Sequence, residues 1–93
     1  MDNTELAPYQ VGYRIFPNPA SDLLYLESIG FAEANQIIAL YNPWGMRVKA
    51  WDQPLPPRGM ATLTVADLPR GLYWLCILKP DGNLVFRYPL LLQ

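Results

Sequence analysis

The stretch that decides the fold reads Leu68-Pro69-Arg70-Gly71-Leu72-Tyr73-Trp74-Leu75-Cys76-Ile77-Leu78-Lys79-Pro80-Asp81-Gly82. Residues 72–78 form an unbroken apolar run of strand length, and a turn signal stands on each side of it. Central strands that are buried on both faces carry such runs, whereas helices are usually longer. Both flanking turns place proline second and glycine fourth, which suits a type I turn followed by a left-handed residue. We therefore predict a central β-strand over residues 72–78.

The same turn pattern occurs four times in the chain. Its other two copies are Asn42-Pro43-Trp44-Gly45 and Pro56-Pro57-Arg58-Gly59. Glycine accepts positive φ angles without steric cost, so we expect such angles at the structural turn glycines Gly45, Gly71 and Gly82. The density of helix and strand breakers in residues 54–59 predicts a longer loop there.

Between the turns, apolar residues alternate with polar ones. Period-two alternation with β-branched and aromatic side chains is typical of half-buried strands. With residues 13–16 included, seven strand-like runs follow at spacings of roughly 8–12 residues, which predicts an all-β antiparallel sandwich. The shared phase predicts a core of Leu24, Leu26, Ile38, Leu40, Val48, Leu63, Val65, Tyr73, Leu75 and Ile77.

The central run has a second apolar face. When Tyr73, Leu75 and Ile77 point into the core, the other face carries Leu72, Trp74, Cys76 and Leu78. Either a loop or the N-terminal segment covers this face, or it is an exposed stripe that meets a partner. The sequence leaves both alternatives open, and with them the burial of Cys76.

The last apolar run contains a proline. Pro89 has no N–H to donate to a ladder, so we predict an edge strand at residues 84–90. We also expect Pro89 to interrupt the ladder and to leave Leu90, Leu91 and Leu92 loosely held and exposed.

The length and composition of the chain are typical of one small domain. The chain has 93 residues, of which 52% are hydrophobic and 16% charged, the opposite of a disordered composition. We expect residues 1–11 to be a flexible linker and residues 12–93 to be the domain. No apolar stretch reaches the length of a membrane helix. Because residues 1–6 lack the pattern of a signal peptide, we expect a fragment of a longer precursor.

Residues that carry chemistry are few. The absence of histidine removes the commonest general base and most zinc sites, and the glycines fall singly rather than in a phosphate loop. Asp52, Asp67 and Asp81 stand beside turns, where Asp commonly bonds nearby backbone. The net charge is −1 and the seven Lys and Arg residues are scattered, which argues against nucleic acid. The sequence therefore predicts no enzyme, no metal or other cofactor, and no nucleic-acid partner.

One segment resembles a known family. Phe16-Pro17-Asn18-Pro19-Ala20, hereafter the signature segment, is similar to the Tyr-Pro-Asn-Pro-Ala signature that opens the type A C-terminal sorting domain of the type IX secretion system. Further similarities follow in the family's order at Leu40-Tyr41-Asn42, Arg47-Val48-Lys49, Leu68-Pro69-Arg70-Gly71-Leu72-Tyr73 and Asp81-Gly82-Asn83. The resemblance covers nearly the whole chain.

The resemblance implies an immunoglobulin-like sandwich without catalytic activity that ends a cargo protein. Such cargo passes through the periplasm, crosses the outer membrane through a translocon, and becomes secreted or bound to the cell surface, where a sortase removes the domain in many members. We expect no insertion of the domain into the membrane. We expect the translocon to recognise the tail and the signature segment, at Leu90, Leu91, Leu92, Gln93, Phe16, Pro17, Asn18 and Pro19.

Two features depart from the family. Only Arg87 is basic in the last strand, where the family often carries lysines, and Cys76 stands where the family tends to be polar. An alternative function stays open: an immunoglobulin-like or fibronectin-like accessory module that binds carbohydrate or protein. Three tryptophans and six tyrosines suit sugar stacking, although such aromatics more often fill a core.

Overall fold

The computed structural model describes residues 12–29, 36–51 and 59–93, and in these residues the chain is all β. Nothing in them forms a helix that could cross a bilayer. The expected linker (1–11) and most of the expected loop (54–59) lie outside the described residues. The described residues form seven strands: β1 (Gly12–Phe16), β2 (Leu23–Ile29), β3 (Ile37–Tyr41), β4 (Arg47–Trp51), β5 (Met60–Thr64), β6 (Gly71–Leu78) and β7 (Leu84–Leu92).

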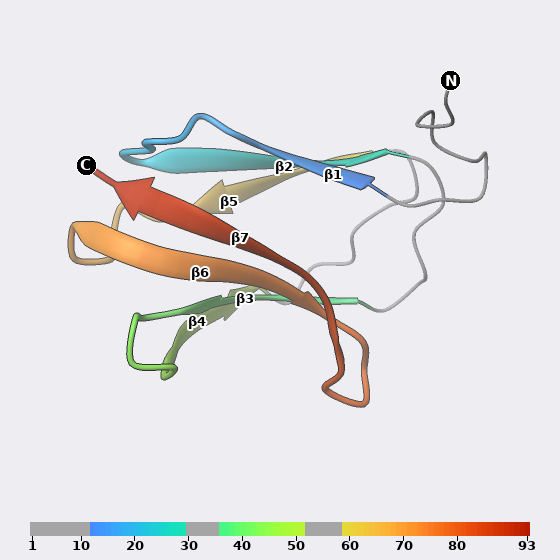
Figure 1. The fold of residues 1–93 in the computed structure, drawn as a ribbon. Helices are drawn as coiled ribbons and strands as arrows, with labels where there is room; N and C mark the ends of the chain where they lie inside the picture. Colours follow the sequence, from blue (N-terminus) through green and yellow to red (C-terminus); the bar gives the residue numbers. More distant parts are fainter. Residues whose placement is uncertain (1–11, 30–35, 52–58) are drawn as a thin grey trace, which may run out of the picture.

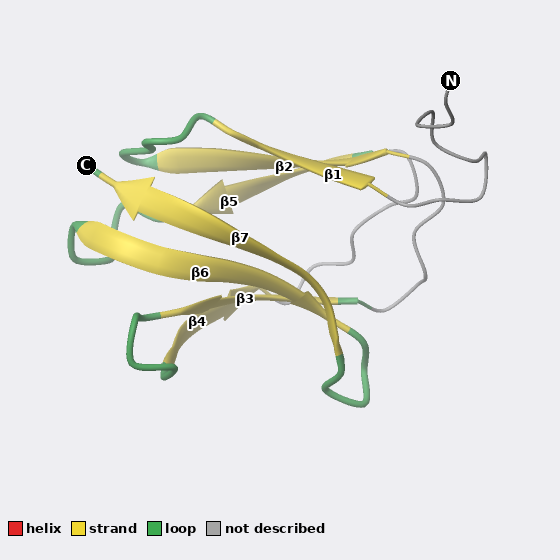
Figure 2. Cartoon of the chain, viewed as in Figure 1, coloured by secondary structure: helices red, strands yellow, loops and turns green. Residues whose placement is uncertain are grey.

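The strands form two antiparallel sheets that pack face to face (Figures 1 and 2). One sheet has the order β1-β2-β5 and the other the order β4-β3-β6-β7. The predicted central strand β6 pairs with β3 on one side and with β7 on the other. This arrangement is an immunoglobulin-like sandwich, in which successive strands are divided between two sheets. The predicted fold class is therefore confirmed.

The core lies between the sheets. Each buried leucine or isoleucine contributes roughly 1.5–3 kcal/mol relative to an exposed one, so this layer supplies most of the driving force for folding. The predicted core residues that are buried are Leu24, Leu26, Ile38, Leu40, Leu63, Val65, Tyr73, Leu75 and Ile77. The positive φ expected at Gly45, Gly71 and Gly82 is also confirmed.

The prediction that Val48 belongs to the core is wrong, because its side chain is 38% exposed. The pairing of β3 with β4 shifts register between Leu40 and Tyr41, which leaves Val48 as an extra residue in β4. Such a bulge bends the strand and changes which side chains point inward. The inward position belongs instead to Trp51, which pairs with Ile38 and is buried.

The prediction of a loose, exposed tail is also wrong. β7 pairs with β6 as far as Leu92, and the side chains of Leu90 and Leu92 are 0% and 1% exposed. The carbonyl of Pro89 points away from β6 and accepts a hydrogen bond from Asn18. Proline at such an outward position removes no ladder bond. The expectation that β7 is an edge strand of its sheet is confirmed.

Candidate functional site

The signature segment lies along the outer edge of β7, near the end of that strand. The side-chain amide of Asn18 donates to the carbonyl of Pro89 at 3.1 Å, and its oxygen accepts from the N–H of Leu91 at 3.0 Å. The N–H of Ala20 donates to the Leu91 carbonyl at 2.9 Å, and the Ala20 carbonyl accepts from the N–H of Gln93 at 2.8 Å. The segment thus covers this part of the edge as a short extra strand would. We call this arrangement the joint.

The residues predicted to be recognised by the translocon differ in their solvent exposure. Pro17, Asn18, Pro19 and Gln93 are exposed, and Phe16 and Leu91 are half-buried. The Phe16 ring lies against Tyr25, with 5.6 Å between ring centroids. Leu90 and Leu92 belong to the core, so they hold β7 in place and are not accessible to a partner.

Arg70 ties the same end of the sandwich together. Its guanidinium donates to the carbonyls of Ser21 at 2.6 Å, Val65 at 2.8 Å, Leu68 at 2.6 Å and Gln93 at 3.5 Å. Hydrogen bonds from a charged donor are stronger than neutral ones. The turn before β6 is thereby fixed both to the loop after the signature segment and to the end of β7.

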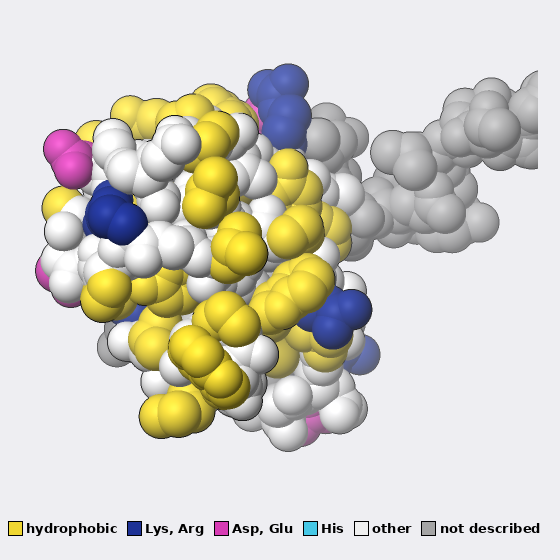
Figure 3. All heavy atoms as spheres, turned by 60° about the vertical axis from the view of Figure 1, so that its left-hand side comes forward, with side chains coloured by type: hydrophobic (Ala, Val, Ile, Leu, Met, Phe, Trp, Pro, Cys, Tyr) yellow, Lys and Arg dark blue, Asp and Glu magenta, His cyan; other side chains and the backbone are white. Residues whose placement is uncertain are grey.

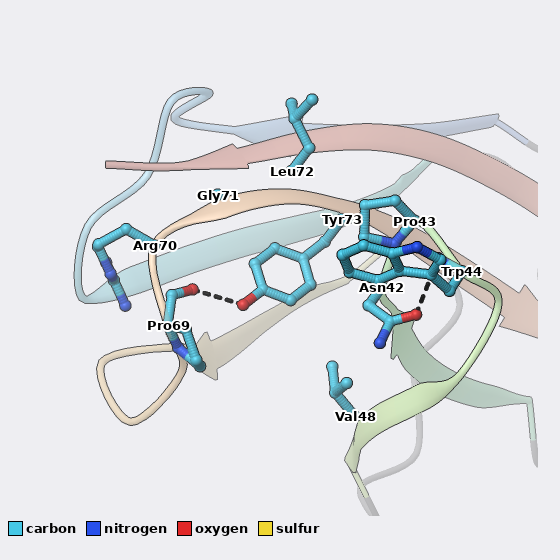
Figure 4. A pocket seen from close by; sticks show the side chains of 9 residues that line it. All are labelled: Asn42, Pro43, Trp44, Val48, Pro69, Arg70, Gly71, Leu72 and Tyr73. Atoms are coloured by element: carbon cyan, nitrogen blue, oxygen red, sulfur yellow. Dashed lines mark hydrogen bonds between the residues drawn. The ribbon is translucent and has the colours of Figure 1, made fainter.

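Two adjoining hollows open beside the turn that joins β3 to β4, and Figure 4 shows the larger of them. The larger, of about 350 Å³, is lined by Asn42, Pro43, Trp44, Val48, Pro69, Arg70, Gly71, Leu72 and Tyr73. The smaller, of about 130 Å³, is lined by Pro43, Leu72, Tyr73, Trp74 and Pro89. Because they share three walls, we describe them together as the groove.

The groove has a hydrogen-bonded floor and an apolar rim. In Figure 4 the Tyr73 hydroxyl points at the Pro69 carbonyl, to which it donates a hydrogen bond. Trp44 on the rim is 83% exposed and Leu72 is 63% exposed. Figure 3 shows hydrophobic side chains gathered on the face that this end of the molecule presents. Contiguous exposed apolar surface of this kind marks interaction sites.

The sequence left open whether the outer face of β6 is covered or exposed, and the structure shows that one end is exposed and the other is covered. Leu72 is exposed and Trp74 half-buried, whereas Cys76 and Leu78 are 6% and 7% exposed. The Arg87 guanidinium lies over the Trp74 ring, 4.5 Å from its centroid. The exposed stripe is therefore confined to the Leu72 end, and Cys76 is buried.

The acidic side chains described beside turns have structural partners. Asp67 forms an ion pair of 2.8 Å with Lys49, and this hydrogen bond lowers the pKa of the Asp67 carboxyl. Asp81 accepts a hydrogen bond from the N–H of Asn83 at 2.9 Å. Within the described ranges, no group of three histidine, cysteine or acidic side chains converges as metal ligands do. Asp52 lies outside the described residues.

Comparison with known protein families matches residues 14–87 to the secretion system C-terminal sorting domain. The matched part begins in β1, includes the signature segment and ends in β7. The chain belongs to this family. The sorting domain is thus a C-terminal sorting signal for type IX secretion, and its cargo is a secreted or cell-surface protein. A search of curated proteins found no match.

The two halves of the joint in this sorting domain are recognisable in the sequence, but their contact is not. The partners of Asn18 lie 71 and 73 positions away, beyond the reach of any local pattern. An Asn between two prolines, with its side chain free to pair, was the available signal. Arg70 gave no signal, because a lone Arg in a turn usually faces solvent.

Proposed function

We propose that this sorting domain is a non-catalytic signal that the outer-membrane translocon recognises as a folded unit at the joint. The observation that carries the proposal is the pair of hydrogen bonds from Asn18 to Pro89 and Leu91. They place two segments from opposite ends of the domain on one surface. Because this surface exists only when both sheets have formed, a translocon that binds it selects folded, complete domains.

The exposed side chains of the joint supply the contacts. Pro17, Asn18, Pro19 and Gln93 face solvent, while Phe16 and Leu91 add half-buried apolar area. The backbone groups of Ala20 and Leu91 already have partners: the Ala20 N–H donates to the Leu91 carbonyl, the Ala20 carbonyl accepts from Gln93, and the Leu91 N–H donates to the Asn18 side chain. Recognition at this point therefore proceeds through side chains, and strand addition is left to the uncovered part of β7.

The partners follow from the order of the export steps. A cargo domain precedes the sorting domain in the chain, the translocon binds it from the periplasm, and a surface sortase acts on it after export. The absence of histidine from the sequence supports a non-catalytic role, because it removes the commonest acid–base group. The sorting domain uses no cofactor and binds no nucleic acid.

An accessory module that binds carbohydrate or protein is the second candidate. The observation that favours it is the 83% exposure of Trp44 beside the groove, since exposed tryptophans stack well on sugars and anchor protein contacts. A module of this kind gives no export to a fused reporter, which separates the two candidates directly.

Export of a reporter tests the proposal. The 93-residue chain is fused behind a periplasmic reporter in a host with type IX secretion, with and without the double substitution Leu91→Ser and Gln93→Ala. We expect the variant reporter to remain in the periplasm while thermal unfolding of the isolated chain shifts by only a few degrees. Leu84→Ser, at an exposed apolar site elsewhere on β7, is the control and leaves export intact. Unchanged surface delivery of the double variant contradicts recognition at the joint.

A further inference from the structure

We propose that the groove beside Trp44 is a second docking site, which takes an extended acidic peptide segment of a partner protein. The groove lies next to the joint, but its exposed rim residues, Trp44 and Leu72, take no part in the joint's hydrogen bonds. The inference does not depend on which protein recognises the joint.

The rim is held ready for contact. The Asn42 side-chain oxygen accepts from the N–H of Trp44 at 3.0 Å and from the N–H of Met46 at 2.9 Å. The backbone N–H of Gly45 donates to the Asn42 carbonyl at 2.9 Å and closes the turn. Trp44 therefore stands on a fixed turn, and binding there orders little chain.

The shape of the groove fits neighbouring side chains of one segment. Its two hollows have unequal size and share Pro43, Leu72 and Tyr73 as walls. A bulky aromatic side chain suits the larger hollow and a smaller aliphatic one the other. Desolvated tryptophans in such positions dominate the binding energy of protein interfaces.

Charge selects the partner. The cation at the groove is Arg87, which lies over Trp74, a wall of the smaller hollow. Arg70 also lines the larger hollow, but its guanidinium is turned away from it (Figure 4) and donates to backbone carbonyls. No acidic side chain lines either hollow. A carboxylate that flanks the apolar side chains of a peptide therefore meets the Arg87 cation and no acidic side chain of the lining. Two copies of this chain packed symmetrically through their grooves would place arginine against arginine, which disfavours a dimer.

Titration of the 93-residue chain followed by nuclear magnetic resonance tests the proposal. The probes are acetyl-Glu-Trp-Leu-Glu-Leu-Glu-amide and the same peptide with Lys in place of each Glu. We expect the acidic peptide to shift the amide signals of Trp44, Gly45 and Leu72 and to bind about tenfold or more tightly than the basic one. Added salt weakens the acidic complex, because exposed charge pairs are screened. Equal binding of both peptides, or binding of neither, overturns the proposal.

Matched substitutions locate the site. Trp44→Ala and Leu72→Ser remove exposed side chains, so the fold persists, and each lowers the affinity for the acidic peptide about tenfold. Leu84→Ser is the control, because Leu84 is 55% exposed and pairs with the opposite end of β6. Unchanged affinity after Trp44→Ala, or dimerisation of the chain that Trp44→Ala abolishes, contradicts the proposal. None of these outcomes bears on reporter export through the joint.

Discussion

Gly45 holds a backbone conformation that other residues adopt only under strain. Its φ is +85°, and an added Cβ would meet no atom within 4 Å, so the strain of a substitution lies in the backbone alone. We expect Gly45→Val to lower the free energy of unfolding by about 1–3 kcal/mol, measured by urea denaturation. Gly45→Asn should lose less, because Asn tolerates the left-handed region. A loss below about 0.5 kcal/mol for the Val variant marks Gly45 as an ordinary surface residue.

A similar loss of stability is expected when Gly71, at the start of β6, is replaced. Its φ is +143° and the space around a Cβ is likewise open. Replacement by Val is expected to reduce the free energy of unfolding by about 1–3 kcal/mol, again through backbone strain. Urea denaturation again measures this change in the free energy of unfolding. An unchanged urea midpoint at a constant slope argues against a strained position there.

Cys76 is a buried thiol rather than a reactive one. Burial raises the pKa of its thiol above the ordinary value, while Arg87 and Arg47 oppose this to a smaller extent. Since the thiolate is the reacting species, a raised pKa means less of it at any given pH. We expect Cys76 to react with a thiol reagent at pH 8 at least about tenfold more slowly in the native chain than in urea.

An exposed cysteine provides the control for this measurement. Leu72→Cys combined with Cys76→Ala places the only thiol on the same strand face at a 63% exposed position. That thiol should react at nearly the same rate in native and unfolded chains. Equal native and unfolded rates for Cys76 itself contradict its burial.

At the scale of elements, the joint makes Asn18 the link between the signature segment and β7. Asn18→Ala removes both side-chain hydrogen bonds to that strand, to Pro89 and Leu91. We expect a loss of about 1–2 kcal/mol in the free energy of unfolding. Amide hydrogen exchange should accelerate at Leu91 but not at Leu90, which is paired with Tyr73 of β6. Unchanged protection of Leu91 contradicts this account.

The strands and turns were predictable because their signals are local. A proline–glycine turn and a period-two run each depend on a few neighbouring residues, and all seven expected strands are present. The face of Val48 was not predictable, since one extra residue in β4 changes the phase without leaving a mark in the sequence. The packing of Leu90 and Leu92 was missed because the sequence does not say which way the backbone of Pro89 points.

The candidate site was less predictable than the strands. The resemblance to a sorting family indicated the signature segment and the tail, but pairing across 71 and 73 positions depends on the complete sandwich. The groove likewise combines the turn after β3 with the turn before β6. Contacts between distant turns follow from topology, which alternation and turn motifs do not specify.

At the scale of the whole molecule, the end of the chain is part of the core. Leu90 and Leu92 are fully buried between the sheets, and Arg70 and Ala20 hold the backbone of Gln93. Truncating one buried leucine typically costs about 2–5 kcal/mol. Small domains have only about 5–15 kcal/mol of total stability. Losing two such leucines together with the edge pairing therefore removes most of the margin.

Deletion of residues 90–93 is consequently expected to unfold the domain, not merely to remove a signal. The truncated chain should lose the cooperative urea transition and the β-sheet circular dichroism of the full chain. Full-length Leu91→Ser, which keeps both buried leucines, should retain both properties. A cooperative transition near the full-length midpoint in the truncated chain contradicts the expectation. If the translocon reads a folded surface, the truncated reporter also stays in the periplasm. Its normal delivery to the cell surface means that an unfolded segment carries the signal.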